Sequence, residues 1–204
     1  PYLPNLASPK PEIYEKSVAT LSAELARCST LEIPYLVTHL GHHLGDGIAG
    51  GRARVIDAIN QALAASRGST MLLLENTAGE KNSVGSTFEH IRGIMDGIDE
   101  KKRIGVCFDT CHAFAAGYDL RTPEGLGTTL GQLDELVGLE NLRVVHLNDT
   151  KGDRGSGLDR HEHIGLGFIG EEGFRHILHD KTIASLPLIC ETPVDGRRDD
   201  RGNI

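Results

Sequence analysis

Long apolar segments are missing from this sequence. No run of about 18 apolar residues occurs, so we expect no segment that crosses a membrane. The first ten residues, PYLPNLASPK, lack an initiating methionine and a basic segment followed by an apolar core, so they do not predict a signal peptide. A CxxC pair is also missing. We therefore expect the four cysteines to be free thiols in a reducing cytoplasm: Cys28, Cys107, Cys111 and Cys190.

An excess of positive charge is missing too. The formal net charge is −8, whereas proteins that bind nucleic acids usually present a basic face to the phosphates. Bound divalent cations would offset most of this negative charge and would supply a positive field that the side chains do not. With 204 residues, of which 39% are hydrophobic and 25% charged, the chain is typical of a single globular domain.

The hydrophobic pattern alternates between short apolar runs and helical periodicity, with no linker or low-complexity segment. We expect strands at 34–39, 71–76, 103–112, 142–149 and 186–193. We expect helices at 11–27, about 52–66, 84–98, 123–137 and 168–183. Continuous apolar runs such as MLLLEN suit parallel strands that are buried on both faces. The pattern therefore predicts one parallel sheet of an α/β protein, connected by right-handed crossovers.

Each expected strand carries a residue that can bind a metal at or near its carboxyl end. These residues are His39, Glu75, Asp109, His146 and Glu191. One such residue alone is more often structural than functional. Five on the same edge indicate a site, because buried apolar strands gain nothing from acidic or imidazole ends that lack a partner or an ion.

Three further donors lie in the segments that follow the strands, namely His112, Asp159 and His161. The full set contains four imidazoles and four carboxylates without a thiolate, which suits Zn²⁺, with Mn²⁺ or Fe²⁺ as alternatives. One ion needs roughly four donors and a carboxylate can bridge two ions, so eight donors predict a metal cluster.

The remaining histidines receive less specific interpretations. His176 and His179 are three residues apart on an expected helix and should face water, and His90 is also a helix residue. We interpret three loop histidines as residues near the rim that support the site or contact substrate: His42, His43 and His163.

Several long segments resemble the endonuclease IV family of zinc-dependent apurinic/apyrimidinic endonucleases in base-excision repair. These segments are THLG-x-H, LLLENTAG, GVCFDTCHAFAAGYD, VVHLNDTK, LDRHEHIGLGFIG and ETP, and they cover nearly the whole chain. The resemblance implies an eight-stranded (β/α) TIM-type barrel with three zinc ions at its C-terminal rim.

The resemblance also assigns residues to the ions. Glu75 would bridge two ions, His39 would bind the first of them, and Asp109, His146 and Glu191 would bind the second. His112, Asp159 and His161 would hold the third ion. Tyr2 would contact DNA at the abasic site.

The sequence departs from this family in its extent. The family carries one more histidine ligand just upstream of PYL and additional strands, whereas about five of the eight strands are found here. We therefore expect residues 1–204 to form a single TIM-barrel-type catalytic domain that is truncated at both ends. The strand at 34–39 would be unpaired on its open side or covered by the N-terminal segment, and the first ion would bind weakly.

The reaction implied by the resemblance is hydrolysis of the phosphodiester 5′ to an abasic site, which leaves a 3′-hydroxyl. Zinc would lower the pKa of a water molecule, and Glu191 or Glu75 would orient this water as the catalytic carboxylates. The partner would be double-stranded DNA with abasic sites, and neither a membrane nor a protein partner is implied.

Two alternatives remain open. The first is a sugar isomerase or epimerase on a related metal-dependent barrel, because such enzymes use a metal set that Glu75, Asp109, His146 and Glu191 could mimic. His112, Asp159 and His161 argue against it, since one or two ions do not need them. The second alternative is an inactive fragment that binds metal or DNA and cleaves nothing.

Overall fold

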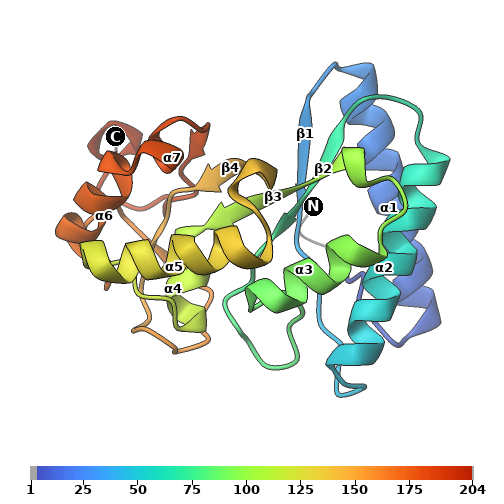
Figure 1. Cartoon of the computed structure of the whole chain (residues 1–204), viewed down its shortest axis with the longest axis horizontal. Coiled ribbons are helices and arrows are strands. Elements are labelled where there is room, and N and C mark those ends of the chain that lie inside the picture. Colours follow the sequence, from blue (N-terminus) through green and yellow to red (C-terminus); the bar gives the residue numbers. More distant parts are fainter. Residues whose placement is uncertain (1–3, 204) are drawn as a thin grey trace.

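The computed structural model describes residues 4–203 and contains one curled sheet of five parallel strands (Figure 1). The order in the sheet is β1, β2, β3, β4 and β7, which follows the order of the chain. The bounds of these strands are Tyr35–Thr38, Met71–Glu75, Ile104–Asp109, Leu142–His146 and Leu188–Ile189. Neighbouring parallel strands connected through helices are the repeating unit of a TIM barrel, and the sheet forms part of one.

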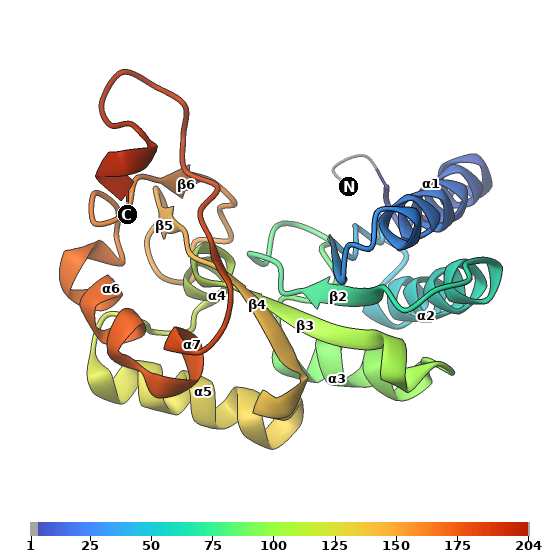
Figure 2. The ribbon, with the colours of Figure 1, turned by 90° about the horizontal axis from the view of Figure 1, so that it is seen from above.

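Most of the helices cover the outer face of the curled sheet, whereas α4 Thr110–Ala116 lies at its carboxyl end (Figure 2). The other helices are α1 Pro11–Thr30, α2 Ile48–Ala65, α3 Phe88–Gly97, α5 Pro123–Leu136, α6 Gly170–His179 and α7 Lys181–Ala184. A two-stranded antiparallel ribbon, β5 Asp149–Thr150 with β6 His161–Glu162, lies beyond the end of β4. The ribbon and α4 lie close to the carboxyl ends of the strands, where they can add side chains to the strand ends (Figure 2).

Strand alternation separates two apolar clusters. Leu72 and Leu74 pack into the large core beneath the helices, whereas Leu73 belongs to a smaller cluster with Cys107 and Val144 on the inner face. Because side chains two residues apart share a face, this inner face continues to the last residue of β2, β3 and β4. The continuation places three polar residues inside the curve of the sheet at its carboxyl end: Glu75, Asp109 and His146.

Both edge strands of the sheet are short. Among residues 4–203, β1 pairs only with β2, as the sequence predicts for this edge. At the other edge, Leu188 and Ile189 of β7 are about 36% and 45% exposed. The two edges of the sheet, with one side each that is unpaired among the described residues and with exposed apolar residues on β7, are therefore its least protected parts.

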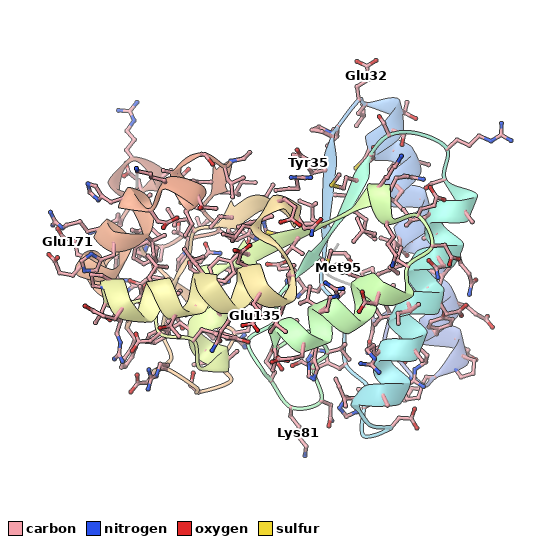
Figure 3. All side chains as sticks on the ribbon, in the orientation of Figure 1. Glu32, Tyr35, Lys81, Met95, Glu135 and Glu171 are labelled. Atoms are coloured by element: carbon pink, nitrogen blue, oxygen red, sulfur yellow. The ribbon has the colours of Figure 1, made fainter. Side chains whose placement is uncertain are left out.

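Charged side chains such as Lys81 and Glu171 project into solvent at the periphery of the molecule (Figure 3).

The structure confirms every expected helix and strand as an element but corrects several boundaries. Residues 110–112 are not strand, because the Asp109 carboxylate accepts a hydrogen bond from the His112 N–H and starts α4. The strand expected at 142–149 ends at His146, and Asp149 belongs to the ribbon. The helix expected at 168–183 is two helices, because Asp180 ends α6 and caps α7.

The last strand is the largest correction. The expected strand 186–193 contains only Leu188–Ile189, so Glu191 lies two residues beyond its end. Pro187 and Pro193 lack an N–H and flank this segment, and within residues 4–203 β7 pairs only with the end of β4. His39 similarly follows β1 directly rather than ending it.

The cysteines are free thiols, as expected, with Cys28, Cys107 and Cys111 buried and Cys190 exposed. No helix within residues 4–203 combines the length and the apolar character needed to cross a bilayer. Tyr2, which the family resemblance places at the DNA, lies outside the described residues.

Candidate metal centre

The structure brings all eight expected donors together at the carboxyl end of the sheet. In the described part of the chain, five overlapping groups of donor atoms occur here, and two of them include a buried thiol, Cys107 beside Glu75 and His146 or Cys111 beside Asp109 and His161. The other three consist of the expected donors alone. We call them the edge group (His39, Glu75, His112), the central group (Glu75, Asp109, His146, Glu191) and the loop group (His112, Asp159, His161). In each group the donor atoms lie within 4.8 Å of one another, close enough to share an ion.

The central group is built on the ends of three adjacent strands. Register pairs Asp109 directly with His146, and Glu75 lies on the neighbouring strand. The His146 Nδ1 atom is 2.9 Å from Glu75 Oε1, 3.2 Å from Glu191 Oε2 and 3.9 Å from Asp109 Oδ2. Glu75 and Asp109 are at most 2% exposed. Two buried carboxylates beside a buried imidazole, with the half-exposed Glu191 at the mouth of the site, favour a bound cation.

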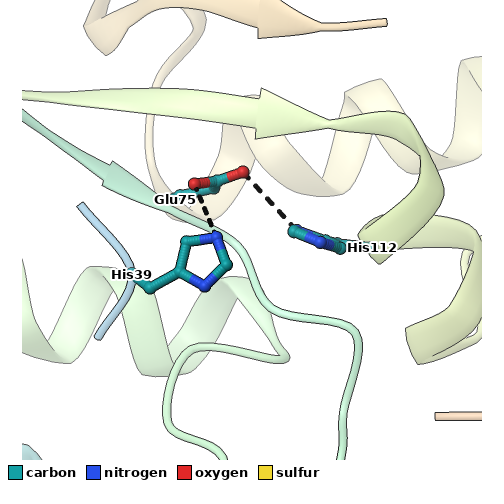
Figure 4. Close-up of side chains that lie close together, drawn as sticks. All are labelled: His39, Glu75 and His112. Atoms are coloured by element: carbon teal, nitrogen blue, oxygen red, sulfur yellow. Dashed lines mark ion pairs between the residues drawn. The ribbon is translucent and has the colours of Figure 1, made fainter. Parts of the chain in front are cut away.

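The edge group extends the site toward β1 (Figure 4). His39 Nε2 lies 3.1 Å from Glu75 Oε2, while His112 Nδ1 lies 3.6 Å from Glu75 Oε1. The two oxygens of Glu75 therefore face different histidines, with Oε2 toward His39 and Oε1 toward His146. This arrangement is the geometry that a bridging carboxylate needs.

The loop group combines α4 with the ribbon and the loop that joins the two ribbon strands. His112 Nε2 lies 3.1 Å from Asp159 Oδ1, and His161 Nε2 lies 3.7 Å from the same oxygen. The Asp109 cap places His112 in the first turn of α4, and pairing of Thr150 with His161 fixes the position of β6. A cavity of about 360 Å³ opens over the site between the edge group, the loop group and Glu191, and Arg160 lines it as well.

The free nitrogen atoms of two imidazoles fit a metal. His112 Nδ1 is bonded to the carbonyl oxygen of Asn76 at 2.9 Å, and His161 Nδ1 to that of Glu191 at 3.0 Å. The opposite Nε2 atoms are buried, and neither makes a hydrogen bond of acceptable geometry within the described residues. A carbonyl on one ring nitrogen and an open second nitrogen is the usual state of a metal-ligating histidine, so these residues fit a zinc-like ion.

The electrostatics of the metal-free cluster point in the same direction. Burial disfavours the charged ring of His112, but Asp109, Asp159 and Glu75 raise its pKa to about 10. Burial also opposes charge on Glu75, while hydrogen bonds with His146 and His39 lower its pKa below the usual range. Burial raises the pKa of Asp109. Without a metal the surrounding carboxylates therefore favour the protonated ring of His112, and a bound ion would replace that proton.

Sequence reasoning missed the amides that support these donors. Asn76 and Asn148 are buried, and both bond to Asp109. Asn76 directly follows the strand end at Glu75 in LLLEN, and Asn148 follows the strand end at His146 after one residue in HLND. This position beside a strand-end donor is the sequence feature that could have indicated a supporting role.

The other histidines have well-defined surroundings. His163 directly follows the ribbon strand that carries His161 and is fully buried, where it contacts Asp195 and Asn203. His43 accepts hydrogen bonds from the N–H groups of Gly45 and Gly47 and shapes its own loop. The backbone of His42 forms a bridge with Ser83. His176 is partly buried and His179 exposed on α6.

Comparison with known sequences reveals close relatives. A family described as a xylose isomerase-like TIM barrel matches residues 1–203. The "Probable endonuclease 4" of Methanoculleus marisnigri is 68% identical over 205 residues, which cover 100% of this chain and 73% of the relative.

Solved structures agree with the sequence relatives. Endonuclease IV from Thermus thermophilus superposes with a TM-score of 0.84 at 39% identity, covering 98% of this chain and 70% of that one. A D-tagatose 3-epimerase-like protein superposes with a TM-score of 0.68 at 20% identity, covering 91% and 65%. The second similarity supports the barrel fold alone.

Proposed function

Because this chain belongs to the endonuclease IV family, we propose that it is a DNA-repair endonuclease that hydrolyses the phosphodiester 5′ to an abasic site and leaves a 3′-hydroxyl. The observation that carries this proposal is the third set of donors. His112, Asp159 and His161 form a group of their own beside the central group, as the three-ion site of such an enzyme requires. The partner is double-stranded DNA containing abasic sites.

The proposed metal assignments follow the three groups. Glu75 and His39 would hold a first ion, and Glu75 with Asp109, His146 and Glu191 would hold a second. His112, Asp159 and His161 would hold the third ion. The mixture of nitrogen and oxygen donors favours Zn²⁺, with Mn²⁺ or Fe²⁺ as alternatives. When bound, the ions supply positive charge for the phosphate oxygens and a water of lowered pKa.

The chain's own residues would orient the reacting groups. Glu191 and Glu75 both lie close to His146 Nδ1, and they would orient a water and hold its proton. Glu191 is 48% exposed and lines the cavity, whereas Glu75 is buried beneath it. Glu191 is therefore the better placed to meet a substrate phosphate. The cations would also help a chain of net charge −8 to bind a polyanion.

The alternative function as a sugar isomerase or epimerase has less support. The epimerase-like structure shares the fold alone at 20% identity, and a site with one or two ions would not need the loop group. An inactive fragment remains an outcome of the test.

A nicking assay tests the proposed function. A duplex with one synthetic abasic site is incubated with the chain, with Glu191→Gln and with the exposed-helix control Glu135→Gln. We expect cleavage 5′ to the site by the unsubstituted chain and by the control. Glu191→Gln should lower the rate by about 10²–10³-fold, because it removes a carboxylate that would hold an ion and orient the attacking water. Binding to the abasic duplex should survive in that variant.

Three results would count against the proposal. The unsubstituted chain could leave the abasic duplex intact while converting a ketose to its epimer, or it could cleave at the same rate after exhaustive chelation. Wild-type cleavage by Glu191→Gln would contradict the role of that carboxylate.

A further inference from the structure

The side chain of Asn148 joins two donors of the central group. Its Nδ2 donates a hydrogen bond to Asp109 Oδ2 at 2.7 Å, and its Oδ1 accepts one from the backbone N–H of Glu191 at 2.7 Å. The amide orientation is determined by chemistry, since a carboxylate can only accept and an N–H can only donate. Asn148 thus connects an interior strand end to the segment that carries Glu191.

The position of Asn148 is itself fixed. Its backbone N–H donates to Thr110 Oγ1 at 2.9 Å, and the same hydroxyl donates to the Asn148 carbonyl at 2.7 Å. The side chain is fully buried. A buried amide whose backbone is held in this way has little freedom to move, so its two side-chain bonds are rigid.

Glu191 depends on this amide more than the other central donors do. Glu75, Asp109 and His146 are terminal residues of strands that pair along their lengths. Glu191 instead lies two residues beyond β7, which has only two residues, and its side chain is 48% exposed. Among the described contacts, its backbone N–H is bonded only to Asn148, and its carbonyl contacts His161 Nδ1.

We propose that Asn148 is a positioning residue that holds Asp109 and Glu191 at the spacing needed for one ion, so that its loss weakens the metal of the central group selectively. The inference rests on the proposed metal-dependent function. Residues that orient metal ligands through a hydrogen bond typically contribute about 10–100-fold to metal affinity. Asn148 contacts two ligands from different elements, Asp109 at the end of β3 and Glu191 beyond the end of β7.

Asn60 provides a matched control. Its amide makes the same two kinds of bond, donating to the Gly97 carbonyl at 3.1 Å and accepting from the Asp99 N–H at 3.0 Å. These bonds join α2 to the end of α3, on the outer side of the sheet. Asn60→Ala therefore reports what the loss of a bridging amide does to the fold without touching a metal donor.

The test measures zinc per chain across graded free-zinc buffers for the unsubstituted chain, Asn148→Ala, Asn148→Asp and Asn60→Ala. Thermal unfolding of the metal-free proteins is measured in parallel. Asn148→Asp keeps the shape of the side chain and the bond from Glu191 N–H but places an oxygen against Asp109. We expect both Asn148 variants to bind one zinc equivalent about 10–100-fold more weakly, with the remaining equivalents unchanged. Asn60→Ala should lose thermal stability only.

A double substitution adds a second readout. If Asn148 acts through Glu191, Asn148→Ala should weaken zinc binding much less in a Glu191→Gln background than in the unsubstituted chain. The proposal is overturned if Asn148→Asp binds zinc like the unsubstituted chain, or if every zinc equivalent weakens equally in proportion to lost thermal stability. A chain that binds no divalent metal in any form would overturn the proposed function instead.

Discussion

The central group and the loop group hold their donors in different ways. Three of the four central donors are terminal residues of paired strands and are almost fully buried. In the loop group only His112 is buried, while Asp159 and His161 are 30% and 18% exposed at the side chain. The sheet therefore preorganises the central group, whereas the loop group depends on a helix cap, a two-stranded ribbon and the loop that joins the ribbon strands.

This difference shows that donors on the strand ends are held rigidly, whereas donors on the loops can change position. Backbone pairing fixes the positions of donors on strand ends when the fold forms, so these donors lose no further conformational entropy when an ion binds. Donors on loops need less free energy to change their positions, and they line the cavity in which a substrate would bind. Substitutions in the two regions should accordingly have different signatures.

The largest effect is expected at the carboxylate that the edge and central groups share. Glu75→Gln removes a charge that both groups use, so two metal equivalents should weaken together and cleavage should fall by at least about 10³-fold. Elemental analysis and the nicking assay measure the two effects, with Glu135→Gln as the control. Loss of a single equivalent would show that Glu75 does not bridge.

Substitution of Asp149, a buried carboxylate outside the three groups, should disturb the loop group. Asp149 accepts hydrogen bonds from five N–H groups, those of Thr150, Gly165, Gly167, Ile169 and Gly170. Asp149→Ala leaves these donors without partners and should lower the free energy of unfolding by roughly 3 kcal/mol.

The same substitution should weaken only the loop-group metal, because Asp149 lies in the ribbon that carries His161. Denaturant unfolding and metal analysis of Asp149→Ala, beside the exposed Asp153→Ala, test both parts. An equal loss of central-group metal would remove the distinction between the two groups.

Protonation gives a third way to test the site as a whole. The pKa of His112 is raised to about 10 in the metal-free fold, so its contribution to stability is fully present below the unfolded value of about 6.5. This contribution should be lost as the pH rises from about 6.5 to 10. Metal affinity should instead increase as the pH rises over the same range, because the deprotonated imidazole is the form that binds the ion.

Thermal unfolding of both forms across this pH range tests the prediction. His112→Gln should flatten the decline in the metal-free form. A metal-free chain whose stability rises from about pH 6.5 to about pH 10 would contradict the assigned charge state.

The smallest effect is expected far from both groups. His179 is exposed on α6, and its ring Nδ1 contacts only the Arg175 carbonyl at 2.6 Å among the described contacts. His179→Ala should change the free energy of unfolding by less than about 0.5 kcal/mol and leave the metal content unchanged. A lost metal equivalent in this variant would mean that the ligand set is incomplete.

The sequence predicted the strand-borne donors better than their supports. Glu75, Asp109 and His146 follow from apolar runs that end on polar residues, since parallel strands must share one carboxyl edge. His39 and Glu191 were found by the same reasoning, although neither belongs to its strand. The pairing partner decides where an edge strand stops, and that information is not local.

The amides and the buried His163 could not be predicted in the same way. Asn148 acquires its role from the approach of Asp109 and Glu191, which are 39 and 43 residues away in the chain. His163 is buried because Asp195 and Asn203 cover it. Such roles depend on tertiary contacts rather than on hydrophobic period or turn chemistry.

The central claim is that these eight residues bind catalytic metal ions, and elemental analysis of the purified chain tests it most directly. The account predicts zinc, manganese or iron in the chain as purified. Two equivalents should resist a chelator longer than the third, because the edge group shares all its donors with the other groups except His39, which is 43% exposed. Removal of the metals should abolish nicking of an abasic duplex, and zinc should restore it. A chain that carries no divalent metal, takes up none from zinc buffer and still cleaves the duplex would contradict the account.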